Sequence, residues 1–417
     1  MYPSLRPAAV LDAKAAPNRP RGFRGGISPN VIFLGLTSLF TDISSEMVNA
    51  ILPIYLLFQL RLTYAEFGLF NGLYLGIAGL MSVVGGLIAD RRGKYKEVAA
   101  AGYATSAACK IGLLAARNAP LPASGVLFVD RVGKGVRSAP RDALISLSSE
   151  PERMGTAFGV HRAFDTAGAV LGPFVAFLIL RAAPTGYDAV FVISFLFALI
   201  GLGVLVLFVQ NRNENKHKGG ATWRGVVNLF TRDDFRTLVI VGAMFGFFTI
   251  ADASIYITFQ NRTLFETSYF PLLYVGTSIS YLVLAIPIGN LADRVGRTRV
   301  FITGYVLLFV VYLVLLAPSP GGLDLVAILA LLGVFYACTD GVLIAMASTV
   351  IPREFRTSGI AVLTTAAALS GIAASTAWGE FANWWGLETT VKVFAVLLGA
   401  MTITGATMLR VRSRRYG

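Results

Sequence analysis

The stretch VDRVGKGVRSAPRDALI, from Val129 to Ile145, holds six charged side chains in a chain that is mostly apolar on either side of it. It can be a water-exposed loop or a charged helix inside a membrane. The choice sets the number of membrane-spanning segments, and therefore the side of the membrane on which every later connection lies. The pattern of the whole chain decides between the loop and the helix.

The composition indicates a protein that crosses a membrane several times. The 417 residues are 55% hydrophobic and 14% charged, with a mean hydropathy of +0.67, whereas soluble domains carry about 25% charged residues. The net charge of +13 does not indicate a nucleic-acid partner, because the Lys and Arg residues form short clusters between apolar runs. Two isolated cysteines and two histidines give no disulfide or metal-ligand spacing, and no cofactor is expected.

Twelve segments are long enough to span a bilayer, which takes about 20 apolar residues. The predicted spans are 30–59, 66–89, 98–117, 121–146, 155–181, 187–209, 236–260, 269–291, 299–317, 323–347, 357–383 and 388–409. They predict five parts in chain order: a disordered cytoplasmic tail (1–28), a six-helix bundle (29–209), a cytoplasmic linker with a possible surface helix (210–235), a second six-helix bundle (236–410) and a basic cytoplasmic tail (411–417). The first tail has no continuous apolar run, so a signal peptide is not expected.

The positive charges decide how the quoted stretch is read. Clusters of Lys and Arg follow the second, sixth, eighth, tenth and twelfth spans, while the odd-numbered connections carry one Arg each. The positive-inside rule then places both termini on the cytoplasmic side of a cytoplasmic (inner) membrane. If Val129–Ile145 were a loop, eleven spans would remain and this alternation would fail. The stretch is therefore predicted to be the fourth membrane helix.

The two halves of the chain resemble each other. GGLIADRRGKYK (85–96) matches IGNLADRVGRTR (288–299), and IYLLFQLR (54–61) matches IYITFQNR (255–262) at nearly the same offset. Such spacing predicts an internal duplication. Repeated halves with a binding site between them, near the bilayer midplane, are a transporter architecture.

The repeated Gly-x-Leu-Ala-Asp-Arg-x-Gly-Arg pattern resembles the signature of the major facilitator superfamily. The resemblance implies an all-α membrane fold of twelve transmembrane helices in two six-helix pseudo-symmetric halves. It also implies a conformational latch on the cytoplasmic side, formed by Gly86, Asp90, Arg91, Gly93, Asp293, Arg294 and Gly296. The alternative is a pair of solvated loops that only fix topology. In either case the first Gly of the pattern is expected to allow close helix approach.

The fifth span carries a second motif. Gly168, Gly172 and Pro173 are similar to the Gly-Pro motif of the superfamily's antiporters, which favours export over uptake. Small residues four apart also allow ordinary tight helix packing, and Pro bends a helix. Both interpretations stay open from sequence alone.

The charges of the fourth span are predicted to lie on one face. Asp130, Lys134, Arg137 and Arg141 follow helical spacing. Arg131, on the adjacent strip, is similar to the Arg of the superfamily's fourth-helix motif. Charge inside a bilayer must face a cavity or a partner. At 1.5 Å per residue, Glu46 lies as deep as Lys134 and Asp42 as deep as Arg137, and the fifth span adds Asp165 and His161.

Two hypotheses compete for this charge cluster. It can be a structural network, or it can couple protons to transport through Asp42, Glu46 and Asp165, because protonation removes the charge that holds a cation. In the second case Arg131, Lys134, Arg137 and Arg141 would line a substrate cavity. The C-terminal half would add Asp252, Tyr256, Tyr336 and Asp340.

The combined prediction is a monomeric secondary active transporter that exports a small anionic or zwitterionic organic solute or drug by proton antiport, with alternating access. Its expected partners are this solute, protons and membrane lipid. An enzyme is not expected, since no nucleotide-binding loop or catalytic set occurs. The alternatives are a divalent metal-ion exporter that uses Asp42, Glu46 and Asp165 as oxygen ligands and a proton-coupled importer.

Overall fold

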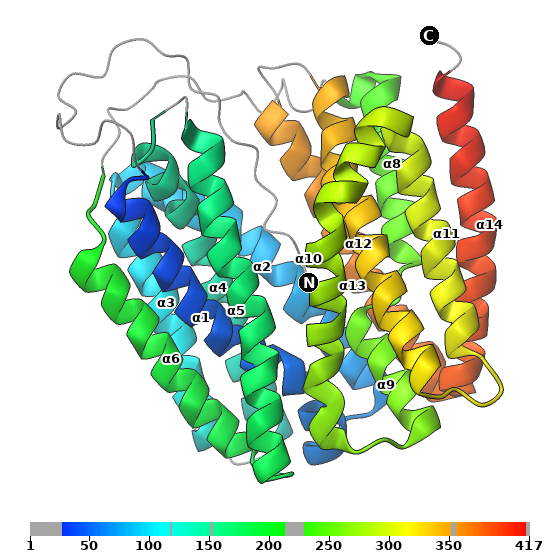
Figure 1. Ribbon diagram of the computed structural model, residues 1–417, viewed down its shortest axis with the longest axis horizontal. Helices are drawn as coiled ribbons and strands as arrows, with labels where there is room; N and C mark the ends of the chain where they lie inside the picture. The colour runs from blue at the N-terminus through cyan, green and yellow to red at the C-terminus, as the bar shows by residue number, and fades with distance from the viewer. Residues whose placement is uncertain (1–26, 117–118, 151–152, 213–228, 352–355, 414–417) are drawn as a thin grey trace. The chain divides into compact units, whose positions relative to one another are not determined.

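The computed structural model describes residues 27–116, 119–150, 153–212, 229–351 and 356–413, and these residues form helices without any strand (Figure 1). The first six long helices are α1 (Pro29–Ile54), α2 (Tyr64–Arg92), α3 (Tyr95–Ala115), α4 (Pro120–Leu147), α5 (Met154–Ala182) and α6 (Tyr187–Phe208). The later ones are α8 (Asp233–Phe247), α9 (Asp252–Thr263), α10 (Phe270–Val295), α11 (Arg297–Leu315), α12 (Gly322–Val350), α13 (Arg356–Trp385) and α14 (Leu387–Ser413). A π-helical turn, η1 (Tyr55–Gln59), extends α1, and the short 3-10 turns are η3 (Leu229–Thr231) and η4 (Thr267–Tyr269).

Eleven segments of the described chain are long and apolar enough to cross a membrane, with α8 and α9 together forming one of them. The helix that does not qualify by composition is α4, because it contains the six charges of the quoted stretch. Its 28 residues span about 42 Å at 1.5 Å per residue, which exceeds the roughly 30 Å of the hydrocarbon core. The prediction of an all-α protein with twelve transmembrane helices is confirmed. The predicted surface helix of the linker falls largely on residues 213–228, which lie outside the described residues, as does most of both predicted tails.

The structure divides into two compact units. Of the described residues, the N-terminal unit contains those up to Ile51 and those from Ile77 to Arg212, and the C-terminal unit contains Leu52–Gly76 and those from Leu229 onward. The helix α2 therefore contributes its first half to the C-terminal unit and its second half to the N-terminal unit. The predicted division into bundles at residues 29–209 and 236–410 stays a prediction of the sequence.

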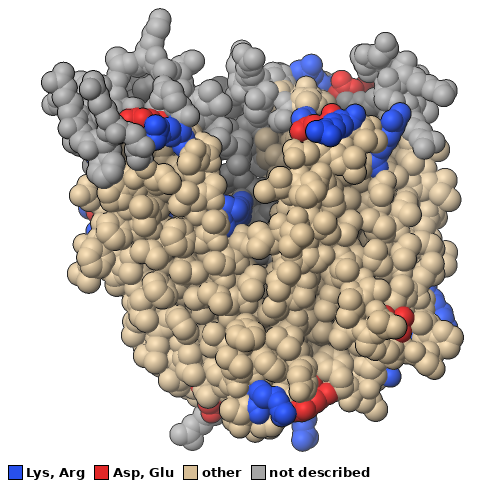
Figure 2. Space-filling view, viewed as in Figure 1, with Lys and Arg blue, Asp and Glu red and all other residues tan. Residues whose placement is uncertain are grey.

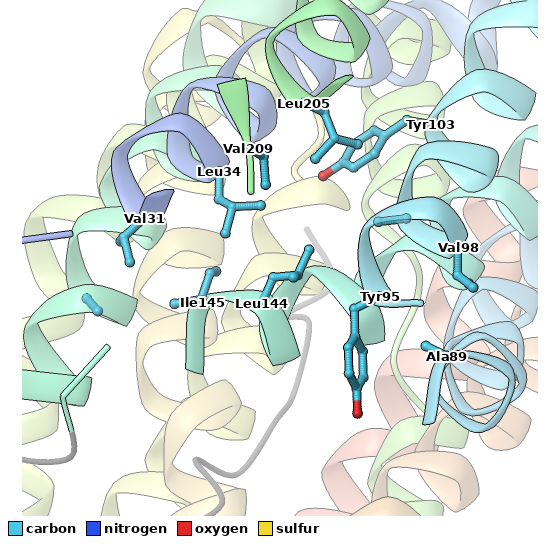
Figure 3. Close-up of a cluster of buried hydrophobic side chains, with 12 residues drawn as sticks. Val31, Leu34, Ala89, Tyr95, Val98, Tyr103, Leu144, Ile145, Leu205 and Val209 are labelled. Carbon is cyan, nitrogen blue, oxygen red and sulfur yellow. The ribbon is translucent and has the colours of Figure 1, made fainter. Parts of the chain in front are cut away.

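Within the N-terminal unit, α4 is closely packed in spite of its charges. A Cβ built at Gly133 would lie 2.9 Å from the carbonyl oxygen of Gly102 in α3, and one at Gly135 would lie 2.5 Å from that of Ala78 in α2. Such backbone contact is what small residues at helix interfaces permit. Figure 3 shows the C-terminal turns of α4, where the fully buried Leu144 and Ile145 join an apolar cluster from α1, α2, α3 and α6.

Within the C-terminal unit, the first half of α2 packs against α13 through a seam of small residues. A Cβ at Gly68 would lie 2.4 Å from the carbonyl oxygen of Ser375 and 2.7 Å from the Cα of Gly379. The amide of Asn71 donates a hydrogen bond of 3.2 Å to the hydroxyl of Ser375. This backbone contact explains why the start of α2 clusters with the C-terminal helices.

The surface is typical of a membrane protein. Large apolar side chains are more than half exposed on several helices, among them Val283 and Ile286 of α10 and Val396 and Ile403 of α14. On the face shown in Figure 2, charged side chains lie mainly toward the two ends of the helices and an uncharged band lies between them. An apolar band of this kind suits a lipid environment.

Candidate functional site: the charged helix and its partners

The charged stripe of α4 meets a carboxylate at each step along its length. Lys134 Nζ lies 3.0 Å from Glu46 Oε1, and Arg137 Nη2 lies 3.6 Å from Asp42 Oδ1. These are the two pairs expected from the equal depth of the residues. One turn further along α4, Arg141 Nη1 lies 3.7 Å from Asp165 Oδ1. The structure therefore brings the three predicted coupling carboxylates to three successive cations of one helix.

Asp130, at the start of the stripe, has buried partners on α3 that the sequence prediction missed. Lys110 Nζ of α3 and Ser106 Oγ each donate a hydrogen bond of 2.5 Å to Asp130 Oδ1, and Arg131 Nη2 lies 3.5 Å from Asp130 Oδ2. All three charged side chains are buried. Lys110 is the only charged residue in the apolar run of residues 98–116, and a lone ionisable residue in a membrane helix is itself a signal of a buried partner.

Arg137 is held by a ring as well as by a carboxylate. Its guanidinium carbon lies 4.3 Å from the centre of the Tyr103 ring on α3, within the range of a cation–π interaction. Its side chain is only 3% exposed. A guanidinium held between an aromatic face and Asp42 is better suited to hold α1, α3 and α4 together than to meet a solute directly.

Arg141 is the centre of a hydrogen-bonded chain. Its Nε donates to Asp142 Oδ1 at 3.1 Å, and its Nη1 donates to Ser38 Oγ at 3.1 Å. Ser38 Oγ also lies within hydrogen-bond distance of His161 Nε2, 2.9 Å away, and the tautomer of the ring sets which of the two donates. The other ring nitrogen, His161 Nδ1, lies 3.7 Å from Asp165 Oδ2. Ser38 was also missed, because a hydroxyl in an apolar helix gives no distinctive pattern.

The Lys134–Glu46 pair differs from the others in its access to solvent. Its two side chains are 26% and 22% exposed, whereas no other member of the cluster named so far exceeds 14%. The amide of Asn49 donates a hydrogen bond of 3.0 Å to Glu46 Oε2, which fixes one carboxylate oxygen and leaves the other for Lys134. Of the four cations predicted to line a substrate cavity, only Lys134 has an accessible side chain with the present pairing.

The small residues of α5 determine where α1 lies. A Cβ at Gly168 would lie 2.9 Å from the Cβ of Asp42, and one at Gly172 would lie 2.9 Å from the Cβ of Glu46 and 2.8 Å from the carbonyl oxygen of Ile43. Both glycines and Pro173 are buried. The motif that resembles the antiporter signature is therefore the surface against which the two carboxylates of α1 are seated.

In the C-terminal unit, the helix predicted at 236–260 is broken between α8 and α9. Tyr312 of α11 bridges the break: its hydroxyl accepts a hydrogen bond of 2.7 Å from the Ile250 N–H and donates one of 3.2 Å to the Phe248 carbonyl. Broken backbone inside a membrane needs such partners, since no water replaces the lost helix bonds. The sequence gives no proline or glycine at the break itself, so this feature was not predicted.

The four residues predicted to face the solute from the C-terminal half take different positions. Tyr336 donates a hydrogen bond of 2.6 Å to Asp252 Oδ1, at the first residue of α9. Tyr256 is buried, bonds Thr277 at 2.7 Å and packs against the Phe270 and Tyr274 rings, so it has no free surface to offer a solute. Asp340 is partly buried on α12.

A cavity of about 440 Å³ lies between α10 and α12. Tyr281 and Tyr336 line it, together with Asp293 near the end of α10 and Arg297 at the start of α11. It therefore connects the region of the Asp252–Tyr336 contact with the second copy of the repeated motif.

The two motif copies share a turn but differ in packing. Gly93 and Gly296 both have positive φ angles, +63° and +108°, a conformation that glycine adopts freely. Arg297 donates to Asp293 Oδ1 at 2.8 Å and to the Ala345 carbonyl of α12 at 3.2 Å, which ties the end of α10 to α12. Arg91 and Arg294 are exposed, and the Asp90 side chain lies outside the described residues.

The predicted close approach at the first glycine of the motif needs correction. At Gly86 a Cβ would lie 3.1 Å from Ala139 of α4, but at the neighbouring Gly85 it would lie 2.2 Å from the Val136 carbonyl oxygen. At Gly289, in the second copy, no atom lies within 4 Å. The tight contact is therefore made by Gly85, which the repeat does not share, because Ile288 occupies the matching position.

The metal-ion alternative finds no support from the described residues. Among them, no three His, Cys, Asp or Glu side chains lie close enough together to hold a metal ion. Asp42, Glu46 and Asp165 each lie beside a different cation instead of converging. Cations at these distances repel a divalent ion.

The chain is duplicated and all-helical in its described part, and its helices enclose paired charges. This fold and this site define a multi-pass membrane transporter. The family model of the Major Facilitator Superfamily matches residues 34–279 and 265–416, and the chain belongs to this superfamily. An uncharacterized MFS-type transporter of Methanocaldococcus jannaschii is 31% identical over 358 residues, which cover 84% of this chain and 87% of that one.

Solved structures support the same fold. The nucleoside transporter NupG superposes with a TM-score of 0.78 over 91% of this chain and 99% of its own, at 16% identity. A POT family transporter in complex with 5-aminolevulinic acid superposes with a TM-score of 0.79 over 95% and 98%, at 14% identity. Identities this low show the fold and say nothing of the cargo.

Proposed function

We propose that this chain is a proton-coupled exporter of a small charged organic solute, working by alternating access in the cytoplasmic membrane. The observation that carries the proposal is the Lys134–Glu46 pair, at 3.0 Å and partly open to solvent, on a helix whose other cations are buried with their own carboxylates. An accessible carboxylate that holds a cation can exchange that cation for a proton. The buried pairs supply the fixed frame around it.

The division of α2 between the two units supports the alternating-access part of the proposal. Its first half is packed against α13, and its second half is packed against α4 through Gly85 and Gly86. If the units rock against each other, α2 must bend or its seam with α13 must open. Rocking of the two halves is the usual mode of this architecture.

The direction of export rests on the Gly168, Gly172 and Pro173 motif, which resembles that of antiporters. Its contact with Asp42 and Glu46 gives the motif a physical link to the coupling residues, because a shift of α5 must move both carboxylates. An importer of the same fold would share the charge pairs. The direction of proton movement separates the two.

Proteoliposomes test the proposal. With the purified protein in sealed vesicles and a pH-sensitive dye inside, a transported solute should drive protons in the opposite direction. Glu46→Gln should abolish this proton movement. The matched change Glu388→Gln in the exposed α14 pair should alter neither the proton movement nor solute counterflow, which needs no gradient. Full proton-driven transport in Glu46→Gln, Asp42→Asn and Asp165→Asn would end the proposal, and protons moving with the solute would indicate import.

A further inference from the structure

The interior of the charge cluster is balanced. Each of its cations lies within 4 Å of a carboxylate: Lys110 and Arg131 of Asp130, Lys134 of Glu46, Arg137 of Asp42, and Arg141 of Asp142 and Asp165. Five basic residues therefore face five acidic ones. Arg162, more than half exposed, adds a further cation only at the rim, 3.9 Å from Asp165. Among the described residues, the interior of the cluster therefore offers an incoming solute no surplus charge of either sign.

Balance restricts which solutes can bind at the accessible pair. A solute with only a negative charge must take Lys134 from Glu46, which leaves a carboxylate without its cation in a confined site. A solute with only a positive charge must take Glu46 from Lys134, which leaves the lysine without its carboxylate. Leaving one member of an ion pair without its partner in a partly enclosed site is unfavourable. A solute that carries both charges can replace both contacts at once.

From this geometry we infer that the cargo is a zwitterion, whose ammonium binds Glu46 and whose acidic group binds Lys134. The inference rests on the proposed transport function and names its substrate class. Asn49 supports it, because it already holds Glu46 Oε2 and so keeps the carboxylate in place when Lys134 swings away. Lys134 has a long flexible stem and can move; Glu46 is seated against the backbone of α5 at Gly172.

The same charges connect the cargo class to the direction of coupling. The charged groups that act on Glu46 are Lys134 and, beyond it, Arg131, both on α4; from α5 it meets the uncharged Gly172. A protonated Glu46 no longer attracts an ammonium, so a zwitterion and a proton compete for this residue, as antiport requires. A simple anion would bind better once Glu46 is protonated and would travel together with the proton.

Matched probes of different charge test the class. The purified protein in detergent is screened by thermal unfolding with leucine, isocaproate and isoamylamine, which share the isobutyl group. A second set is alanylalanine, its N-acetyl form and its amide. The zwitterion of at least one set should bind at least about tenfold more tightly than its singly charged analogues, because it leaves neither Glu46 nor Lys134 unpaired. Glu46→Gln and Lys134→Met should each remove that preference, and the swap of Glu46→Lys with Lys134→Glu should restore it.

A zwitterionic lipid headgroup presents the same two charges, so short-chain phosphatidylethanolamine forms a separate arm. A response to this lipid and to no amino acid or peptide identifies the headgroup as the source and keeps the class. Glu388→Gln, in the exposed α14 pair with Lys392, is the matched control and should keep the preference. Stabilisation by a singly charged analogue through Glu46 or Lys134, or by no zwitterion at all, overturns the inference.

The binding screen uses no gradient, so its result does not depend on coupling. A zwitterion that binds through Glu46 and Lys134 but moves no protons in vesicles would end the proposed proton coupling and leave this substrate class intact. Proton movement driven by isocaproate, which is a simple anion, would end this substrate class and leave the proposed proton coupling intact.

Discussion

Adding one methyl group at Gly172 should displace the carboxylates of α1. In Gly172→Ala the new Cβ would lie 2.8 Å from the Ile43 carbonyl oxygen and 2.9 Å from the Glu46 Cβ. Non-bonded carbon atoms prefer separations of about 3.5–4.0 Å, so α1 and α5 must separate by roughly 0.5–1 Å. Overpacking of this kind costs about 1–3 kcal/mol.

The same substitution should also weaken coupling. Glu46 moves with α1 while Lys134 stays on α4, so the 3.0 Å contact lengthens or the lysine shifts. Thermal unfolding in detergent measures the stability, and solute-driven proton movement in proteoliposomes measures coupling. We expect a loss of about tenfold in the coupled rate, which corresponds to about 1.4 kcal/mol.

A second glycine provides the control. A Cβ at Gly203 of α6 meets no atom within 4 Å, so Gly203→Ala should be neutral or slightly stabilising, since Ala favours helix over Gly by about 1 kcal/mol. If Gly172→Ala unfolds and transports as the unchanged protein does, the argument that this glycine seats Glu46 is refuted.

Three further predictions concern other parts of the structure. Lys110→Met should lower the free energy of unfolding by about 3–5 kcal/mol, because it leaves Asp130 with one cation fewer. The added change Asp130→Leu should recover part of this stability, and the control Lys392→Met on the exposed face of α14 should not change it measurably. Tyr312→Phe should cost about 1–3 kcal/mol because the buried Ile250 N–H loses its acceptor, whereas the exposed Tyr269→Phe should not; equal melting of the two variants would contradict the bridging role. Gly68→Val should separate α2 from α13. With both native cysteines removed, cysteines placed at Asn71 and Ser375 should cross-link rapidly in the parent and poorly in this variant. Unchanged cross-linking would show that the contact between the two helices tolerates the larger side chain.

The sequence predicted the pairs of α1 and α4 because helix geometry is regular. Two residues at equal depth on neighbouring helices are candidates to meet, and Glu46–Lys134 and Asp42–Arg137 do so. The same reasoning could not find Ser38 or Tyr103, since a hydroxyl or a ring has many uses in a helix bundle. Lys110 could have been found, because a lone lysine in an apolar helix must have a partner.

Residue spacing along the chain was less informative about contacts that depend on how the helices pack against each other. The repeat drew attention to Gly86 and Gly289, yet the closest backbone contact is at Gly85. Tyr256 looked available to a solute, but Phe270 and Tyr274 enclose it. The break between α8 and α9 has no local signal, because its free backbone groups are satisfied by Tyr312 from a distant helix.

The sequence by itself determined the number of helices, the duplication and the charged character of the fourth helix, since hydrophobic length, charge alternation and repeat spacing are properties of the chain in one dimension. It also identified VDRVGKGVRSAPRDALI as a helix rather than a loop. Only the tertiary structure decided which of its cations are buried and which is accessible. Exposure depends on the side chains that neighbouring helices bring, and those contacts left Lys134 and Glu46 as a pair in which both side chains stay partly exposed.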